Sequence, residues 1–340
     1  MNQPAELAAP IAELLARAGI AAALDAITPC AQGGNNRIYR VDTTAGVFAA
    51  KQYFRHEGDA RDRLAAEYAF LTYASGAAPG ATARPFACNP QSDIALYEFV
   101  HGRPLRHDEV GKPHVDAAIR LFRALNAPAA RAGAQLPVAS EACFSLAGHV
   151  DLIRGRIDRL LEVAPRSDLD GEALEFFRRL DAFWRDFAGR LREDAAHAGI
   201  AFDASLAPEQ RCISPSDFGF HNALATADGG IRFVDFEYAG WDDPAKTAGD
   251  FFAQLALPAP PGLFAHFVAE ITRDFPDAAQ LAFRAGLLRP AYQIKWCCIA
   301  LNVFLPVNLA RRRFANPDLD EAALKRTQLA KGKQLFQSIR

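Results

Sequence analysis

The sequence has no run of about 18 consecutive apolar residues, which is the length that a membrane-spanning helix requires. Its Ala-rich beginning is interrupted by Glu6, Glu13 and Arg17, a pattern typical of an amphipathic helix. We therefore expect a soluble, cytoplasmic protein with no membrane partner.

An excess of charge of one sign is also missing. The chain carries 38 basic and 40 acidic residues, for a formal net charge of −2. A chain without an overall electrostatic bias offers little attraction to a polyanion. We therefore expect no nucleic-acid partner, and the composition leaves the oligomeric state open.

Paired cysteines are absent as well. The six cysteines form no C-x-x-C pair and have no interleaved histidines, so the sequence indicates neither a zinc site nor a disulfide framework. Cys297 and Cys298 fall inside an apolar helical pattern, where buried free thiols are expected.

What the sequence does contain is a change of pattern along its length. With 340 residues, half of them hydrophobic, the chain can bury a large core and form two domains. The first third contains short strand-like runs and one internal helix, and helical periodicity dominates afterwards. The predicted strands are 26–30, 37–41, 47–54 and 94–100, and the predicted helix is 59–74. We predict an N-terminal lobe over 1–100 and a helical lobe over 101–340.

A hairpin interrupts the helical part. Residues 223–226 and 231–236 read as strands on either side of a turn with the sequence Ala-Asp-Gly-Gly. Apolar residues at three- and four-residue spacing predict long helices over 176–191 and 287–305. The predicted fold class is therefore α+β, with a β-rich part, a helical part and a cleft between them.

Three polar residues surround this hairpin. Asp217 and Asn222 are five positions apart in the loop before it, and Asp235 follows its second strand. Such residues offer two carboxylates and one amide as oxygen donors on either side of the hairpin. Mg²⁺ favours such oxygen ligands and needs few of them from the protein. An Asp and an Asn at this spacing are, taken alone, ordinary turn formers.

With Asp235 included, the segment resembles the catalytic and metal-binding segment of kinase-like enzymes, and the chain from Gln32 to about Asp250 is similar to the aminoglycoside phosphotransferase and choline kinase family. The resemblance implies a protein-kinase-like fold with a small lobe of antiparallel sheet and one helix, and a larger helical lobe containing the hairpin. It implies ATP and Mg²⁺ as cofactors and a small-molecule hydroxyl as acceptor. It further implies Asp217 as catalytic base, with Asn222 and Asp235 as Mg²⁺ ligands.

A lysine and a glutamate in the first lobe fit the same reading. Lys51 lies in a strand with few other charges, and Glu67 shares a helix face with Leu64 and Leu71, where a carboxylate needs a cation. The resemblance implies that Lys51 pairs with Glu67 and contacts the nucleotide phosphates. The alternative is a local pair between Glu67 and Arg63, four residues earlier on the helix.

Two further segments resemble nucleotide-binding elements. Gly33 and Gly34 lie between the first two strands, where the family folds a loop over the phosphates, although an ordinary hairpin turn is the alternative. Glu98 and Val100 resemble the hinge whose backbone binds the adenine edge, with a plain edge strand as the alternative.

Two positions bear on the catalytic loop itself. Asp250 stands where the family has a structural Asp that braces this loop, with a surface helix residue as the alternative. Pro215 stands where the family usually has His. Proline fixes φ near −65° and lacks an N–H, so other bonds must hold the loop.

The functional hypothesis is an enzyme, a small-molecule kinase. Only eight residues separate Asp235 from a helix predicted to begin near Pro244, too few for the peptide-binding platform of protein kinases. One alternative is a nucleotide-binding pseudokinase that acts as a scaffold or regulator and is expected to lack one of the reactive groups. Another is a serine hydrolase that uses Ser214 or Ser216 with His221. The sequence does not contain the G-x-S-x-G turn that such an enzyme uses.

Overall fold

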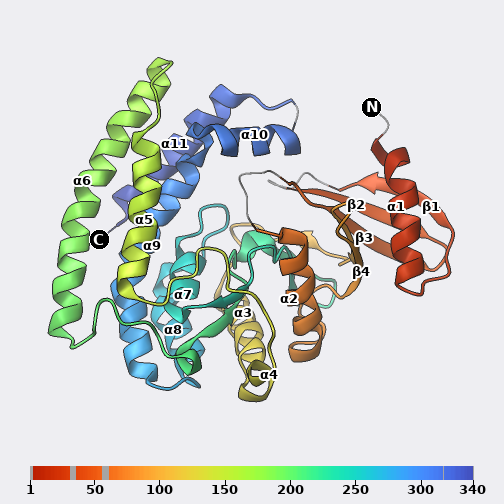
Figure 1. Cartoon of the computed structure of the whole chain (residues 1–340), viewed down its shortest axis with the longest axis horizontal. Coiled ribbons are helices and arrows are strands. Elements are labelled where there is room, and N and C mark those ends of the chain that lie inside the picture. Colours follow the sequence, from red (N-terminus) through yellow and green to blue (C-terminus); the bar gives the residue numbers. More distant parts are fainter. Residues whose placement is uncertain (1–2, 31–35, 56–60, 317, 340) are drawn as a thin grey trace.

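The structure is a computed structural model and describes residues 3–30, 36–55, 61–316 and 318–339. Figure 1 shows the sheet of the N-terminal part at one end of the molecule and a large assembly of helices at the other. This arrangement confirms the predicted α+β, two-lobed fold. The division between residues 100 and 101 remains a prediction.

The N-terminal lobe contains a five-stranded antiparallel sheet in the order β1-β2-β3-β5-β4. The strands are β1 (Leu24–Pro29), β2 (Arg37–Thr43), β3 (Gly46–Gln52), β4 (Pro85–Asn89) and β5 (Ile94–Glu98). Four of them lie where the sequence predicts strands. β4 was not predicted, because it is short and begins with a proline, which disfavours a strand interior.

Helices cover both faces of this sheet. Side chains alternate between the faces along a strand, so Phe48 and Ala50 of β3 pack with α1 (Gln3–Arg17) in one core. Lys51 points to the opposite face, toward α2 (Arg63–Ala77). The lobe therefore has an N-terminal helix in addition to α2, and the charged face of β3 is the one that α2 covers.

The C-terminal lobe is mainly helical, and its apolar stripes form one continuous core. Its helices are α3 (Lys112–Leu125), α4 (Pro128–Ala132), α5 (Leu146–Leu161), α6 (Asp168–His197), α7 (Pro244–Ala253), α8 (Phe264–Thr272), α9 (Ala278–Leu301), α10 (Pro306–Ala315) and α11 (Glu321–Gln337). Short 3₁₀ helices cover Pro208–Gln210, Phe220–Asn222, Pro261–Leu263 and Asn302–Phe304. The two long predicted helices correspond to α6 and α9.

Helices α7 and α9 pack very closely. A Cβ atom added at Gly249 of α7 would lie 2.4 Å from Cγ of Tyr292 on α9, so only glycine fits there. Asp243 caps the N-terminus of α7 by accepting a hydrogen bond from the backbone N–H of Ala245 at 2.7 Å. α7 is thus fixed in position at both its start and its middle.

Short strands between the helices position the loops of the cleft. β8 (Ala223–Ala225) and β9 (Ile231–Phe233) form the predicted hairpin, which β6 (Arg103–Pro104) extends. β7 (Cys212–Ser214) pairs with β10 (Gly240–Asp242) in a separate two-stranded sheet. Ser214, which precedes the loop that carries Asp217, is therefore the strand partner of Gly240, which follows the segment after Asp235.

Among the described residues, no single helix has both the length and the apolar character to cross a membrane, and only the pair 278–304 and 306–313, bent by 71°, passes on length and composition. All six cysteines are free thiols, and Cys297 and Cys298 are buried in α9 as predicted.

Candidate active site

The loop after β7 carries Asp217 at its exposed side. Ser214, Pro215 and Ser216 are buried, whereas 32 % of the Asp217 side chain is exposed, so this carboxylate lies at the surface of a buried loop. Ser216 has a φ of +65°, a left-handed conformation that is unusual for a residue other than glycine. The backbone at Ser216 turns sharply and thereby sets the direction of Asp217.

Asn222 folds back onto the same loop. Its amide nitrogen donates to the backbone oxygen of Asp217 at 3.0 Å, and its own backbone oxygen accepts from the N–H of Val234 at 2.9 Å. The first bond orients the side-chain amide so that its oxygen is directed away from Asp217. The second brings Asn222 beside Asp235, which follows Val234 directly.

His221 is a neighbour of Asp217 to which the sequence reading gave no role in the kinase site. Its Nε2 lies 3.3 Å from Oδ1 of Asp217, four positions away, and its Nδ1 is buried without a hydrogen-bond partner among the described residues. Ser214 and Ser216 form their hydrogen bonds with other groups, so the structure does not assemble the serine–histidine pair of the hydrolase alternative.

Lys51 joins the two lobes through carboxylates. Its ammonium lies 2.6 Å from Glu67 and 2.6 Å from Asp235, so the predicted pair with Glu67 is formed. Burial alone would lower the pKa of Lys51, but Asp235 and Glu67 raise that pKa well above its usual value. Lys51 is therefore a charged group at the junction of the lobes.

Glu67 is held by three donors. Besides Lys51, the Tyr53 hydroxyl donates to it at 2.8 Å and the backbone N–H of Phe236 at 3.1 Å. Burial raises the pKa of Glu67, while the Lys51 ammonium opposes that rise. Because Phe236 follows Asp235, Glu67 holds both the lysine and the backbone next to the second acidic residue.

Glu237 provides a second contact between the lobes. It is fully buried and accepts from Asn36 at 2.7 Å and from Arg63 at 2.9 Å. Arg63 thus pairs with Glu237 across the lobes, and the alternative of a local pair between Arg63 and Glu67 is wrong. We call Lys51, Glu67, Asp235 and Glu237 the cleft cluster.

The hinge-like residues have well-defined partners. The N–H of Glu98 donates to the backbone oxygen of Arg84 at 2.8 Å, so it is not available to a nucleotide base. The Glu98 carboxylate forms two bonds with Arg232 of β9, at 2.7 and 2.8 Å, which lower its pKa. Val100, two residues after the end of β5, is buried. Gly33 and Gly34 lie outside the described residues.

The oxygens at the cleft fit Mg²⁺ chemically. Asn222 offers an amide oxygen whose partner nitrogen is already bonded, and Asp235 offers a carboxylate that is 36 % exposed. Asp235 also has a φ of +67°, which turns this side chain out of the strand direction. Among the described residues, no three or more His, Cys, Asp or Glu side chains form a group that could hold a metal ion.

Asp250 is buried in α7 and is not a surface residue. It accepts from Lys295 at 2.9 Å and from Trp296 at 2.9 Å on α9, and it lies 3.2 Å from Lys246. Its connection to the loop that carries Asp217 runs through Lys246, whose ammonium donates to the Ser216 hydroxyl at 3.1 Å. The sequence reading missed Lys246, although it is four residues from both Asp242, at the end of β10, and Asp250, on α7, and pairs with each of them.

Comparison with known proteins gives a consistent result. A model of the phosphotransferase enzyme family matches residues 26–283, which is more than half of the chain. No curated protein matches the sequence significantly.

Solved structures resemble the whole chain. A choline/ethanolamine kinase family protein from Mesorhizobium loti superposes with a TM-score of 0.59 at 18 % identity, over 97 % of this chain and 94 % of that one. A choline kinase from Streptococcus pneumoniae gives 0.57 at 11 % identity, over 98 % and 99 %. AMP-bound spectinomycin phosphotransferase gives 0.60 at 11 % identity, over 99 % of both chains. At these identities the likeness concerns the fold.

Proposed function

The chain belongs to the phosphotransferase enzyme family, and from this premise we propose that it transfers the γ-phosphate of ATP to a hydroxyl group of a small molecule. The observation that carries the proposal is the convergence of both lobes on one place. Lys51 from the first lobe touches Asp235 from the second, and the hairpin sets Asp235 beside Asn222, which is bonded to Asp217.

In the proposed reaction, Asp217 accepts the proton of the acceptor hydroxyl while the acceptor oxygen forms a bond to the γ-phosphorus. The bond between that phosphorus and its bridging oxygen breaks, and the oxygen leaves on ADP with the electron pair. Lys51 is assigned to the phosphates, because a charged ammonium fixed by Glu67 suits a polyanion.

The Mg²⁺ ion is assigned to the oxygens of Asn222 and Asp235. When bound, it supplies positive charge that neutralises the phosphate oxygens. Asp235 is the only one of the two that brings a negative charge, and it is exposed enough to exchange its contact with Lys51 for another partner.

Nucleotide binding is assigned to the cleft between the lobes. Among the residues predicted for this role, Lys51 and Glu67 belong to the cleft cluster. Glu98 and Val100 keep the hinge role only through backbone groups other than the N–H of Glu98. The role of Gly33 and Gly34 as a phosphate-covering loop stays a prediction from the sequence.

A small acceptor is favoured by the segment after Asp235. The backbone of this segment is fixed within a few residues: Phe236 bonds to Glu67, and Gly240 begins β10. A Cβ atom at Gly240 would lie 2.2 Å from the backbone oxygen of Pro137, so this strand runs directly against another loop. Such a tight connection leaves no extended platform for a protein substrate.

The pseudokinase alternative expects one reactive group to be missing. Lys51, Asp217, Asn222 and Asp235 are all present, and the structure brings them together in a bonded series. Phosphate transfer is therefore the function that this geometry favours.

The test is a screen for acceptors with Mg²⁺ and radiolabelled ATP. Choline, ethanolamine, spectinomycin and a panel of sugars are offered separately, and label in the low-molecular-weight fraction is compared with that of Asp217→Ala as the matched blank. We expect Asp217-dependent labelling of at least one compound. Asp217-dependent labelling of added protein alone would overturn the small-molecule assignment, and turnover no higher than the blank with every compound would favour the pseudokinase.

A further inference from the structure

The catalytic loop is held by a lysine below it. Pro215 removes one backbone donor from the loop, so its conformation depends on the bonds made by its neighbours. We propose that Lys246 is a positioning residue, which acts through the Ser216 hydroxyl to fix the direction of the Asp217 carboxylate. This inference rests on the proposed role of Asp217 and adds a residue to it.

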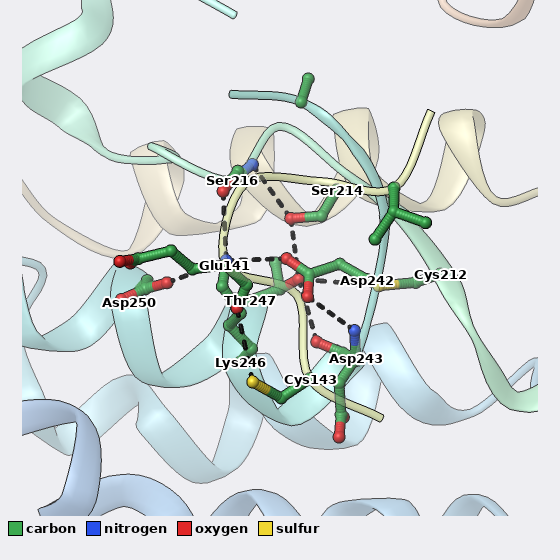
Figure 2. A network of polar contacts seen from close by, with 12 residues as sticks. Glu141, Cys143, Cys212, Ser214, Ser216, Asp242, Asp243, Lys246, Thr247 and Asp250 are labelled. Carbon is green, nitrogen blue, oxygen red and sulfur yellow. Dashed lines mark hydrogen bonds and ion pairs between the residues drawn. The ribbon is translucent and has the colours of Figure 1, made fainter. Parts of the chain in front are cut away.

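The ammonium group of Lys246 is surrounded by three oxygen atoms that fix its position. Figure 2 shows its ammonium between Ser216 and the carboxylates of Asp242 and Asp250. The distances from Nζ are 3.1 Å to the Ser216 hydroxyl, 2.8 Å to Asp242 and 3.2 Å to Asp250. The ammonium donates hydrogen bonds to Ser216 and Asp242 and forms an ion pair with Asp250, so all three oxygens fix its position. The side chain is 1 % exposed, so solvent does not compete for these bonds.

Ser216 is tied to the same helix a second time. Its backbone N–H donates to the Ser214 hydroxyl at 3.0 Å, and that hydroxyl accepts from Thr247 at 2.9 Å. Lys246 and Thr247 are consecutive residues of α7. The left-handed backbone of Ser216 is strained relative to an ordinary conformation, so it persists only where neighbouring bonds hold it.

The helix that supplies these bonds is itself fixed. Asp250 is bonded to Lys295 and Trp296 of α9, and Gly249 lies against Tyr292. We call Asp242, Asp243, Lys246 and Asp250 the bracing network. Through this network, the position of Asp217 depends on the close packing of α7 against α9.

A purely structural role for Lys246 is the competing explanation. Lys246 neutralises Asp242 and Asp250, and its loss would destabilise the lobe wherever the catalytic loop pointed. The Ser216 hydroxyl separates the two explanations, because it is neutral and is the contact through which Lys246 reaches the loop. Removing this hydroxyl leaves the ion pairs of Lys246 in place.

The experiment measures phosphate transfer to water, the simplest hydroxyl, as ADP release from Mg²⁺ and ATP by Ser216→Ala, Ser216→Gly, Asp217→Ala and the natural protein. Misplacing a reactive group by about 1 Å costs on the order of 10²-fold in rate. We expect both Ser216 variants to lose about 10- to 100-fold in maximal rate while the dissociation constant for ATP changes less than about twofold. Glycine adopts the left-handed conformation freely, so a loss in Ser216→Gly reports the missing contact and not backbone strain.

Thr272→Val is the matched control for deleting a buried hydroxyl. Thr272 lies in α8, and among the described residues its hydroxyl bonds only to the backbone oxygen of Val268, at 2.8 Å. Losing this hydroxyl should therefore lower stability without lowering the rate per folded molecule. A double-mutant cycle of Ser216→Ala with Lys246→Met completes the test. We expect no further loss of rate in the double variant, because both changes remove the same contact.

The outcomes are distinct. Turnover by Asp217→Ala close to that of the natural protein would overturn the proposed function. An inactive Asp217→Ala together with a Ser216→Ala rate within about twofold of the natural one would overturn only the positioning role. Multiplying losses in the double variant would overturn it as well. If Lys246→Met does not fold, the two Ser216 variants alone decide the question.

Discussion

The cleft cluster and the bracing network are both built from one lysine and three carboxylates, but they differ in how far solvent reaches them. Each sets carboxylates against a buried lysine. In the cleft cluster, 36 % of the Asp235 side chain is exposed, whereas Asp242 and Asp243 of the bracing network are fully buried. The cleft cluster joins two lobes, and the bracing network lies around one helix. The comparison teaches that an exposed carboxylate can exchange partners, while an enclosed one can only keep them.

The largest effect expected from this contrast is catalytic. Asp217 lies between the two groups and contacts solvent, so its removal should cost little stability. We expect Asp217→Ala to lower the maximal rate by about 10²–10⁴-fold, the usual contribution of a positioned base, while ATP still binds. ADP release and nucleotide titration by calorimetry measure the two quantities. A rate within a few-fold of the natural one would contradict the assignment.

Next in size is the loss of stability when the bracing network is broken. Asp243 accepts from Arg284 at 2.8 Å and lies 3.0 Å from His149, and all three side chains are buried. Because Asp243→Asn leaves Arg284 buried without a counter-charge, we expect it to lower the free energy of unfolding by about 3–5 kcal/mol, measured by urea denaturation.

The matched control for Asp243→Asn is Asp320→Asn. Asp320 also caps a helix, through the N–H of Ala323 at 2.9 Å, but in an exposed position. Asparagine caps a helix about as well as aspartate, so Asp320→Asn removes only the negative charge near the helix N-terminus and should cost about 0.3–1 kcal/mol. Equal losses in the two variants would show that burial of the Asp243 pair contributes nothing.

A third prediction concerns pH. Burial alone would raise the pKa of Asp243, but Arg284 and His149 bring that pKa down to about 2. Between about pH 4 and pH 2 the unfolded chain then binds the proton that the folded chain does not, so this contribution to stability is complete above pH 4 and is lost as the pH falls. It amounts to at most about 2 kcal/mol.

The measurement for this third prediction is the free energy of unfolding at pH 5 and at pH 3. Other carboxylates also titrate in this window, so only the difference between the natural protein and Asp243→Asn isolates one group. We expect the variant to lose less stability over this interval. An identical loss in both proteins would refute the role of Asp243.

The smallest effect is expected at the exposed end of the cleft cluster. Asp235→Asn keeps the shape of the side chain but removes the charge assigned to Mg²⁺, so affinity for ATP should fall about tenfold more with Mg²⁺ than with EDTA. Asp228→Asn in the hairpin turn is the control, since the hydrogen bonds of the Asp228 side chain to the described residues stay within that turn. Equal losses with and without the metal would remove Asp235 from the site.

The sequence predicted those parts of the site that follow from local periodicity. Helix spacing placed Glu67 on an apolar face where a carboxylate needs a cation, and the family resemblance implied that Lys51 is that cation. The partners of Glu237 could not be found in this way, because Asn36 and Arg63 lie about 200 and 174 positions earlier and meet it only after the lobes pack.

The bracing network likewise combines a local spacing that the sequence shows with contacts that form only when distant segments pack. The triad of Asp242, Lys246 and Asp250 is visible as four-residue spacing, but its contact with Ser216 depends on the pairing of β7 with β10. That Asp250 is a buried residue also depends on this packing. The charge spacing around Lys246 is therefore visible in the sequence, while its contact with Ser216 is visible only in the folded structure.

The segment that connects the second acidic residue to α7 has a consequence for how such an enzyme is regulated. Arg61 donates to the backbone oxygens of Glu237 and Ala239, each at 3.0 Å, and Trp241 exchanges backbone bonds with the loop at Pro137 and Ala139. A segment fastened so often does not melt and reorder at low cost, which is what a phosphorylation switch requires. We expect a catalyst that is always assembled, with its output set by the amount of protein made and the acceptor it meets.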